Sequence, residues 1–81
     1  MIEVFKTNVR NSHHANMLME KIHSSFPSYT ANFDLADCDN ILRVKSTSEA
    51  VEPMLLIDLL RQHGFHAEVL PDEVLFSTNS N

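Results

Sequence analysis

Residues 29–45 read YTANFDLADCDNILRVK, and this stretch decides the fold because it predicts two strands joined by a short polar turn. Its first part alternates apolar with polar side chains, which is the period of a strand with one dry face. The apolar positions there are Tyr29, Ala31, Phe33 and Leu35. ILRVK alternates again after the turn ADCDN, so we predict a hairpin with strands at 29–35 and 41–45.

The segment before the hairpin predicts a strand followed by a helix. IEVFKTNV is rich in β-branched and aromatic residues, which favours a strand near 2–8 with Val4, Phe5 and Val9 contributing to the core. Asn11 or Ser12 can cap a helix near 12–26, which Pro27 ends. Its apolar stripe consists of Ala15, Leu18, Met19, Ile22 and Phe26.

The segment after the hairpin predicts a helix followed by a strand. Pro53 suits the first position of a helix near 53–63, and Gly64 suits the left-handed residue that stops it. The apolar stripe of this helix consists of Leu55, Leu56, Leu59 and Leu60. FHAEVL then predicts a strand near 65–70.

The predicted order is strand, helix, strand, strand, helix, strand. We therefore predict an α+β, ferredoxin-like βαββαβ sandwich, with a four-stranded antiparallel sheet and two helices on one face. Residues 1–70 should form a single domain, because a chain of 81 residues has little room for a second core. Residues 71–81 are expected to be a flexible C-terminal tail.

The composition argues against several classes of partner. The formal net charge is −5 with neutral histidines, and the six lysines and arginines are scattered. Binding to a phosphate backbone needs clustered positive charge, so we expect neither nucleic acid nor membrane as a partner. The RNA-binding form of this topology also needs exposed aromatic residues on the central strands, and ILRVK has none.

The remaining global features favour a small cytoplasmic protein without enzyme activity. Cys38 is the only cysteine, so no disulfide can form within the chain. MIEVFKTNVR does not resemble a signal peptide, and the longest apolar run, MLLI at 54–57, is too short to span a bilayer. No nucleophile, base and acid occur at a usable spacing, and a single glycine excludes a phosphate-binding loop.

Three connections should meet at one end of this sheet: the first strand-to-helix loop, the hairpin turn and the second helix-to-strand loop. They carry four of the five histidines and the only thiol, namely His13, His14, His63, His66 and Cys38. We expect His23, on the body of the first helix, to face solvent without a role.

Three stretches resemble the heavy-metal-associated (HMA) domain family, which includes copper chaperones and the N-terminal domains of metal-transporting P-type ATPases. FKTNV, NFDLADCDNILRVKS and LLIDLLRQHGFHAEVL are similar to its first strand, its middle hairpin and its second helix with the following Gly-aromatic pair. The resemblance spans roughly residues 3–70 and implies the ferredoxin-like fold. It also implies that Val9 anchors the first loop and that Phe65 closes this loop from the side.

The chain departs from this family at its Met-x-Cys-x-x-Cys loop. Val9 stands at the Met position, Asn11 at the first Cys position and His14 at the second. Cu(I) is soft and prefers thiolates, which an amide and an imidazole do not replace. The resemblance therefore implies the scaffold without Cu(I) transfer, and we expect Asn11 to cap the helix rather than to bind a metal.

The adjacent histidines leave two interpretations open. The dipole at a helix N-terminus disfavours imidazolium, and neutral imidazole ligates Zn(II), Ni(II) or Cu(II), so His13 and His14 together with His63 predict a weak divalent-metal site. Cys38 is a further candidate for completing such a site. In the alternative, the histidines are solvated and the chain is a regulatory or protein-interaction module with a protein partner. Spacings such as H-x₃-H or C-x₂-C, which would favour a metal, are absent.

Overall fold

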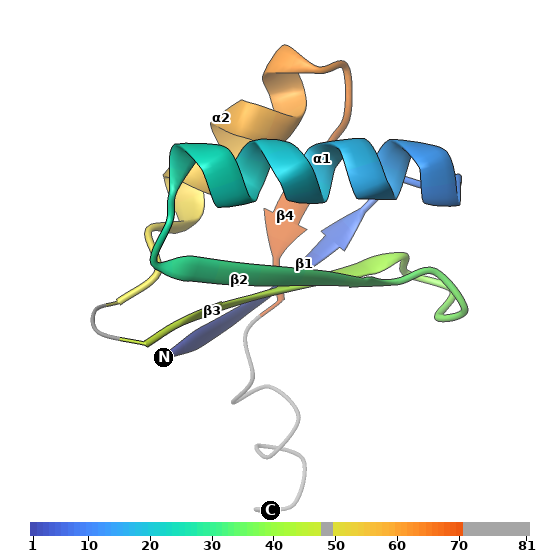
Figure 1. Ribbon diagram of the computed structural model, residues 1–81. Helices are drawn as coiled ribbons and strands as arrows, with labels where there is room; N and C mark the ends of the chain where they lie inside the picture. The colour runs from blue at the N-terminus through green and yellow to red at the C-terminus, as the bar shows by residue number, and fades with distance from the viewer. Residues whose placement is uncertain (48–49, 71–81) are drawn as a thin grey trace, which may run out of the picture.

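The computed structural model describes residues 1–47 and 50–70, so the predicted tail at 71–81 lies outside the described residues. The four strands of the described part form one sheet in the order β2-β3-β1-β4, and every pair in it is antiparallel. Both helices lie on the same face of this sheet (Figure 1). The elements are β1 (Ile2–Thr7), α1 (Ser12–Ser25), β2 (Tyr29–Asp34), β3 (Ile41–Ser46), α2 (Pro53–Gln62) and β4 (Ala67–Val69). The predicted ferredoxin-like sandwich is confirmed.

The hairpin and the first strand lie where the sequence predicts them. β2 pairs with β3 from Tyr29↔Ser46 to Asp34↔Ile41. β1 lies between β3 and β4, and its partners in β3 run from Lys45 to Ile41. The order leaves β2 at one edge of the sheet and β4 at the other.

The last strand is shorter than the predicted 65–70. It comprises only Ala67–Val69, and its register runs from Phe5↔Val69 to Thr7↔Ala67. The preceding Phe65 donates its N–H to the Leu60 carbonyl at 2.9 Å, which closes the end of α2. That N–H is therefore used by the helix end and not by the sheet.

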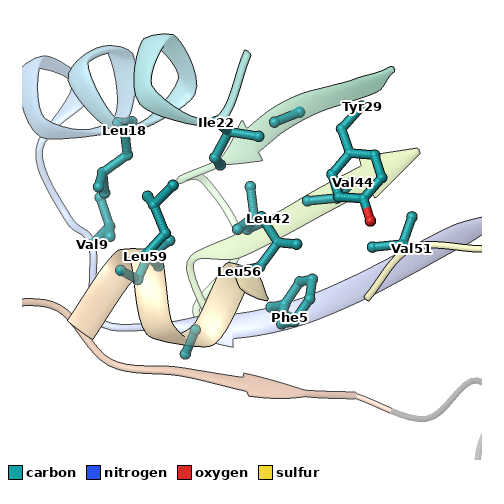
Figure 2. Close-up of a cluster of buried hydrophobic side chains, with 14 residues drawn as sticks. Phe5, Val9, Leu18, Ile22, Tyr29, Leu42, Val44, Val51, Leu56 and Leu59 are labelled. Carbon is teal, nitrogen blue, oxygen red and sulfur yellow. The ribbon is translucent and has the colours of Figure 1, made fainter. Parts of the chain in front are cut away.

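The core fills the space between the sheet and the two helices (Figure 2). Phe5 and Val9 are fully buried in it as predicted, whereas Val4 is half-buried, because its side chain alternates to the other face of β1. The fully buried side chains are Phe5, Val9, Leu18, Ile22, Leu42, Val44, Leu56 and Leu60. The prediction for Leu55 is wrong: this residue is 43% exposed, because it lies about 100° around the helix from Leu56, at the border of the buried face.

The two helices begin in different ways. The side chain of Asn11 caps α1, whereas Glu52 at the start of α2 makes no side-chain cap. The N–H of Glu52 instead donates to the hydroxyl of Tyr29 at 2.9 Å. Gly64, with φ of 88°, follows the end of α2 as predicted. Neither described helix combines the length and the hydropathy that crossing a bilayer requires.

Candidate functional site

The three connections meet at one end of the sheet, as the topology predicts. We call this part the histidine end, and it comprises residues 8–14, 35–40 and 63–66. The N–H of Thr7 donates to the Asp39 carbonyl at 3.2 Å, which joins the first loop to the hairpin. Asn8 and His66 exchange two hydrogen bonds: the Asn8 N–H donates to the His66 carbonyl at 3.2 Å, and the Asn8 Oδ1 accepts from the His66 N–H at 2.8 Å. The histidine end is therefore one connected structure.

Thr7 is a contributor that the sequence analysis missed. Its side chain is buried, and its Oγ1 donates to the Asn40 carbonyl at 2.7 Å while it accepts from the Val9 N–H at 3.1 Å. Val9 is fully buried, so the predicted anchor of the loop is present. One hydroxyl thus fixes both the hairpin turn and the backbone that leads into α1.

Asn11, which the resemblance aligns with the first cysteine of the HMA loop, serves as a helix cap. Its Oδ1 accepts hydrogen bonds from the N–H groups of His13 at 2.7 Å and His14 at 3.3 Å. The first turn of a helix has free N–H groups, and a short side-chain oxygen at the cap position satisfies them. The predicted cap is confirmed, and the amide oxygen is committed to the backbone.

The imidazoles of His13 and His14 lie side by side on the surface. Their ring centroids are 6.2 Å apart, and both residues are exposed. The His14 ring also contacts Phe65, with centroids 5.3 Å apart and planes tilted by 55°. Phe65 is half-buried and packs against the core, so it lies beside the loop as the resemblance implies.

His63 has one nitrogen committed to the backbone. Its Nδ1 lies 2.9 Å from the Leu59 carbonyl, one helical turn earlier. A carbonyl oxygen only accepts, so Nδ1 carries the proton in this bond and Nε2 is the nitrogen left for a ligand. Such a bond on the remote nitrogen is also what orients metal-binding histidines.

The predicted histidines are not gathered around a common point. Within residues 1–47 and 50–70, ligand atoms lie within 4.8 Å of one another in a single group of three, formed by Asp37, Cys38 and Asp39 in the hairpin turn. His13, His14 and His63 form no such group. The hairpin group offers two carboxylates and one exposed thiol, and the Asp39 carboxylate lies 3.9 Å from the Lys6 ammonium.

His23 makes a contact that the sequence analysis did not predict. The residue is exposed as a whole, but its Nε2 accepts a hydrogen bond from the Ala31 N–H at 3.0 Å. No spacing in the sequence indicates this bond, because it depends on how α1 lies over β2.

The comparisons with known proteins agree with this architecture. No family model matches the sequence, and no curated protein matches it. The N-terminal domain of PacS from Synechocystis PCC6803 superposes with a TM-score of 0.63 at 17% identity, over 88% of this chain and 98% of that one. A chain of a structure described as "Crosstalk between Cu(I) and Zn(II) homeostasis" gives 0.63 at 18% identity, over 86% and 99%. The chain therefore has the ferredoxin-like fold of HMA domains, and at these identities the likeness concerns the fold alone.

Proposed function

We propose that this protein is an HMA-like domain that does not transfer Cu(I) and that binds a divalent metal weakly through its histidines. The observation that carries the proposal is the pair of hydrogen bonds from the His13 and His14 N–H groups to the Asn11 Oδ1. The amide that replaces the first thiolate is part of the helix start. The residues present do not fit Cu(I), which prefers the thiolates that this loop lacks.

The geometry of His13 and His14 supports a weak site for a borderline metal. A ring bound through nitrogen at about 2 Å has its centroid about 3 Å from Zn(II), so two rings on one tetrahedral ion lie roughly 5 Å apart. The observed separation is 6.2 Å, so the two rings would have to come closer by a change of side-chain rotamer to share one ion. His63 forms no close group of ligand atoms with these two residues, and for this reason we expect low affinity.

A titration with Zn(II) or Ni(II), followed by NMR, tests the divalent site. We expect amide shifts around residues 11–15 and 63–66 together, and weaker binding below about pH 6, where imidazoles take up protons. His14→Ala should weaken binding, whereas His23→Ala, away from the histidine end, serves as the control. Shifts spread evenly over all five histidines would contradict the site.

Competition with a strong Cu(I) chelator tests the other half of the proposal. The wild-type chain should lose Cu(I) to the chelator. The double variant Asn11→Cys with His14→Cys should retain Cu(I), because it restores both thiolates on the family's scaffold. Stoichiometric retention by the wild-type chain would refute the argument from ligand softness.

The second candidate is a regulatory or protein-interaction module without a metal. Two observations favour it: the Asn11 cap fixes the loop, and the imidazoles form no close group of ligands. His13 and His14 are then exposed surface side chains that a protein partner can contact. A titration that moves no amide around residues 11–15 would favour this candidate. The cytoplasm remains the expected location for either function.

A further inference from the structure

The last turn of α1 carries a histidine whose ring is bonded to an edge strand. The Nε2 of His23 accepts from the Ala31 N–H at 3.0 Å. Ala31 lies in β2, which has a sheet neighbour on one side only. α1 lies directly above β2 in Figure 1, so the helix brings the imidazole to the strand.

This bond closes part of an edge that would otherwise offer donors to another strand. Along an antiparallel strand, successive N–H groups point alternately to the two sides, and the Ala31 N–H points away from β3. Tyr29 and Phe33 share that direction. The Tyr29 N–H is also occupied, because it donates to the Phe26 carbonyl at 2.9 Å. Open edges invite pairing with other chains, and proteins block them by devices of this kind.

The acceptor exists only while the imidazole is neutral. A neutral ring has one nitrogen with a free lone pair, whereas both nitrogens of imidazolium are donors. Histidine is the side chain that ordinarily changes charge between pH 5 and 8. Protonation therefore turns the bond from His23 to Ala31 into a contact between two donors, and the N–H of Ala31 is released.

The charged groups around His23 offer the imidazolium little compensation. On the helix-facing side of β2 the only titratable side chain is Tyr29, whose hydroxyl accepts from the Glu52 N–H. α1 itself carries Glu20 and Lys21. The two carboxylates of the neighbouring elements are already paired: that of Asp34 in β2 lies 3.9 Å from the Arg43 guanidinium, and that of Asp58 in α2 lies 2.6 Å from the Arg61 guanidinium. The ion pairs that His residues make in the described ranges involve His66 and Glu68, not His23.

We propose that His23 controls the edge of β2 in a pH-dependent way. The neutral ring blocks the edge by accepting from the Ala31 N–H, and protonation of the ring frees the edge to pair with β2 of a second copy. An antiparallel pairing centred on Ala31 would use the N–H that His23 otherwise holds. It would place Tyr29 opposite Phe33, and Asp34 opposite Ser28. No like charges face each other in this register.

The overall charge favours the same direction of change. The formal net charge is −5 with neutral histidines, and the chain has five histidines. Acidification therefore brings the formal charge towards zero and reduces the repulsion between copies. This general effect does not distinguish His23 from the other histidines, so the test must separate the two contributions.

The test uses three variants of the full chain at about pH 7.5 and about pH 5, the range in which histidine titrates. His23→Gln keeps an amide oxygen as acceptor at both pH values, His23→Ala removes the acceptor, and His66→Ala removes a titrating ring elsewhere. NMR amide exchange, corrected for its intrinsic pH dependence, reports the Ala31 N–H. Sedimentation velocity reports the mass.

In the wild-type chain and in His66→Ala we expect Ala31 protection to fall about tenfold on acidification in dilute samples that stay monomeric, the factor for one ordinary hydrogen bond. In concentrated samples at the lower pH a dimer should form, in which the Ala31 N–H is protected again by the second copy. His23→Gln should stay protected and monomeric at both pH values, and His23→Ala should be unprotected at both in dilute samples. The proposal is wrong if wild type and His23→Gln respond alike, if His23→Ala retains the protection in dilute samples, or if Ala31 opens while the wild-type chain stays monomeric in concentrated samples as well.

Discussion

The first and last turns of α1 carry the same kind of side chain in opposite situations. In the first turn, His13 and His14 have their backbone held by Asn11 while their rings lie exposed at the surface. In the last turn, the ring of His23 is bonded to the Ala31 backbone of the next strand. The difference comes from what lies opposite each turn. The first turn lies at the histidine end, beyond the strands, whereas the last turn lies beside the edge strand β2. A histidine's role therefore depends on the backbone within its reach more than on the histidines beside it in sequence.

The largest effect is expected from removing the packing that holds the last turn on the sheet. Ile22→Ala deletes a fully buried side chain next to His23 and should lower the free energy of unfolding by about 2–5 kcal/mol. Urea denaturation measures this loss, with the exposed Lys21→Ala as its control. A loss below about 1 kcal/mol would mean that the last turn is not anchored by packing, and the contrast with the first turn would disappear.

A smaller effect is expected where a hydroxyl holds the approach to the first turn. Thr7→Val keeps the shape of the side chain but leaves the N–H of Val9 without its acceptor. The free energy of unfolding should fall by about 1–3 kcal/mol, which is the cost of a buried unsatisfied donor. Thr30→Val, at an exposed position of β2, is the matched control in the same urea experiment. Equal stability of the two variants would show that the Thr7 hydroxyl does not fix this backbone.

Removal of the cap tests whether Asn11 is committed to the helix. Asn11→Ala should cost about 1 kcal/mol in the free energy of unfolding, whereas Asn11→Ser, which keeps a cap acceptor, should cost little. Thermal and urea unfolding both measure this difference. If alanine and serine gave the same stability, the Asn11 side chain would be free in solution and the case against it as a ligand would fail.

The smallest effects are expected at the two exposed histidines. His13→Ala should change the free energy of unfolding by less than about 0.5 kcal/mol, as at most surface positions. His14→Ala should cost somewhat more, about 0.5 kcal/mol, because it removes the contact with the Phe65 ring. A large loss of unfolding free energy in His13→Ala would reveal a structural role for its ring. The first turn of α1 would then resemble the last turn, where the His23 ring is bonded to the backbone.

The fold was predictable because its signals are local. The alternation in β2 and β3, the spacing of apolar residues in α1, and Pro53 and Gly64 around α2 each act within a few residues. The errors arose where a neighbouring element decides the outcome. Phe65 and His66 read as strand residues, but the first closes α2 and the second is bonded to Asn8.

The candidate site was predictable only in part. Topology correctly brings the three connections together, and the cap by Asn11 follows from its place before the helix. The imidazoles of His13, His14 and His63 form no close group within the described residues, because adjacent residues on a helix diverge and His63 is bonded to its own helix. The bonds of Thr7 and His23 were missed because each joins elements that only the tertiary structure brings together.

The position of β1 between β3 and β4 has a consequence for how the chain folds. β1 can pair with β4 only after the rest of the chain between them has folded back. The bond between Asn8 and His66 that accompanies this pairing joins residues 58 positions apart. Closing so long a loop costs entropy before any contact repays it, whereas the hairpin of β2 and β3 closes locally. We therefore expect the hairpin to form early and the three residues of β4 to dock last. The same short strand should be the first part of the sheet to detach in the native state, which would briefly expose the side of β1 that it covers.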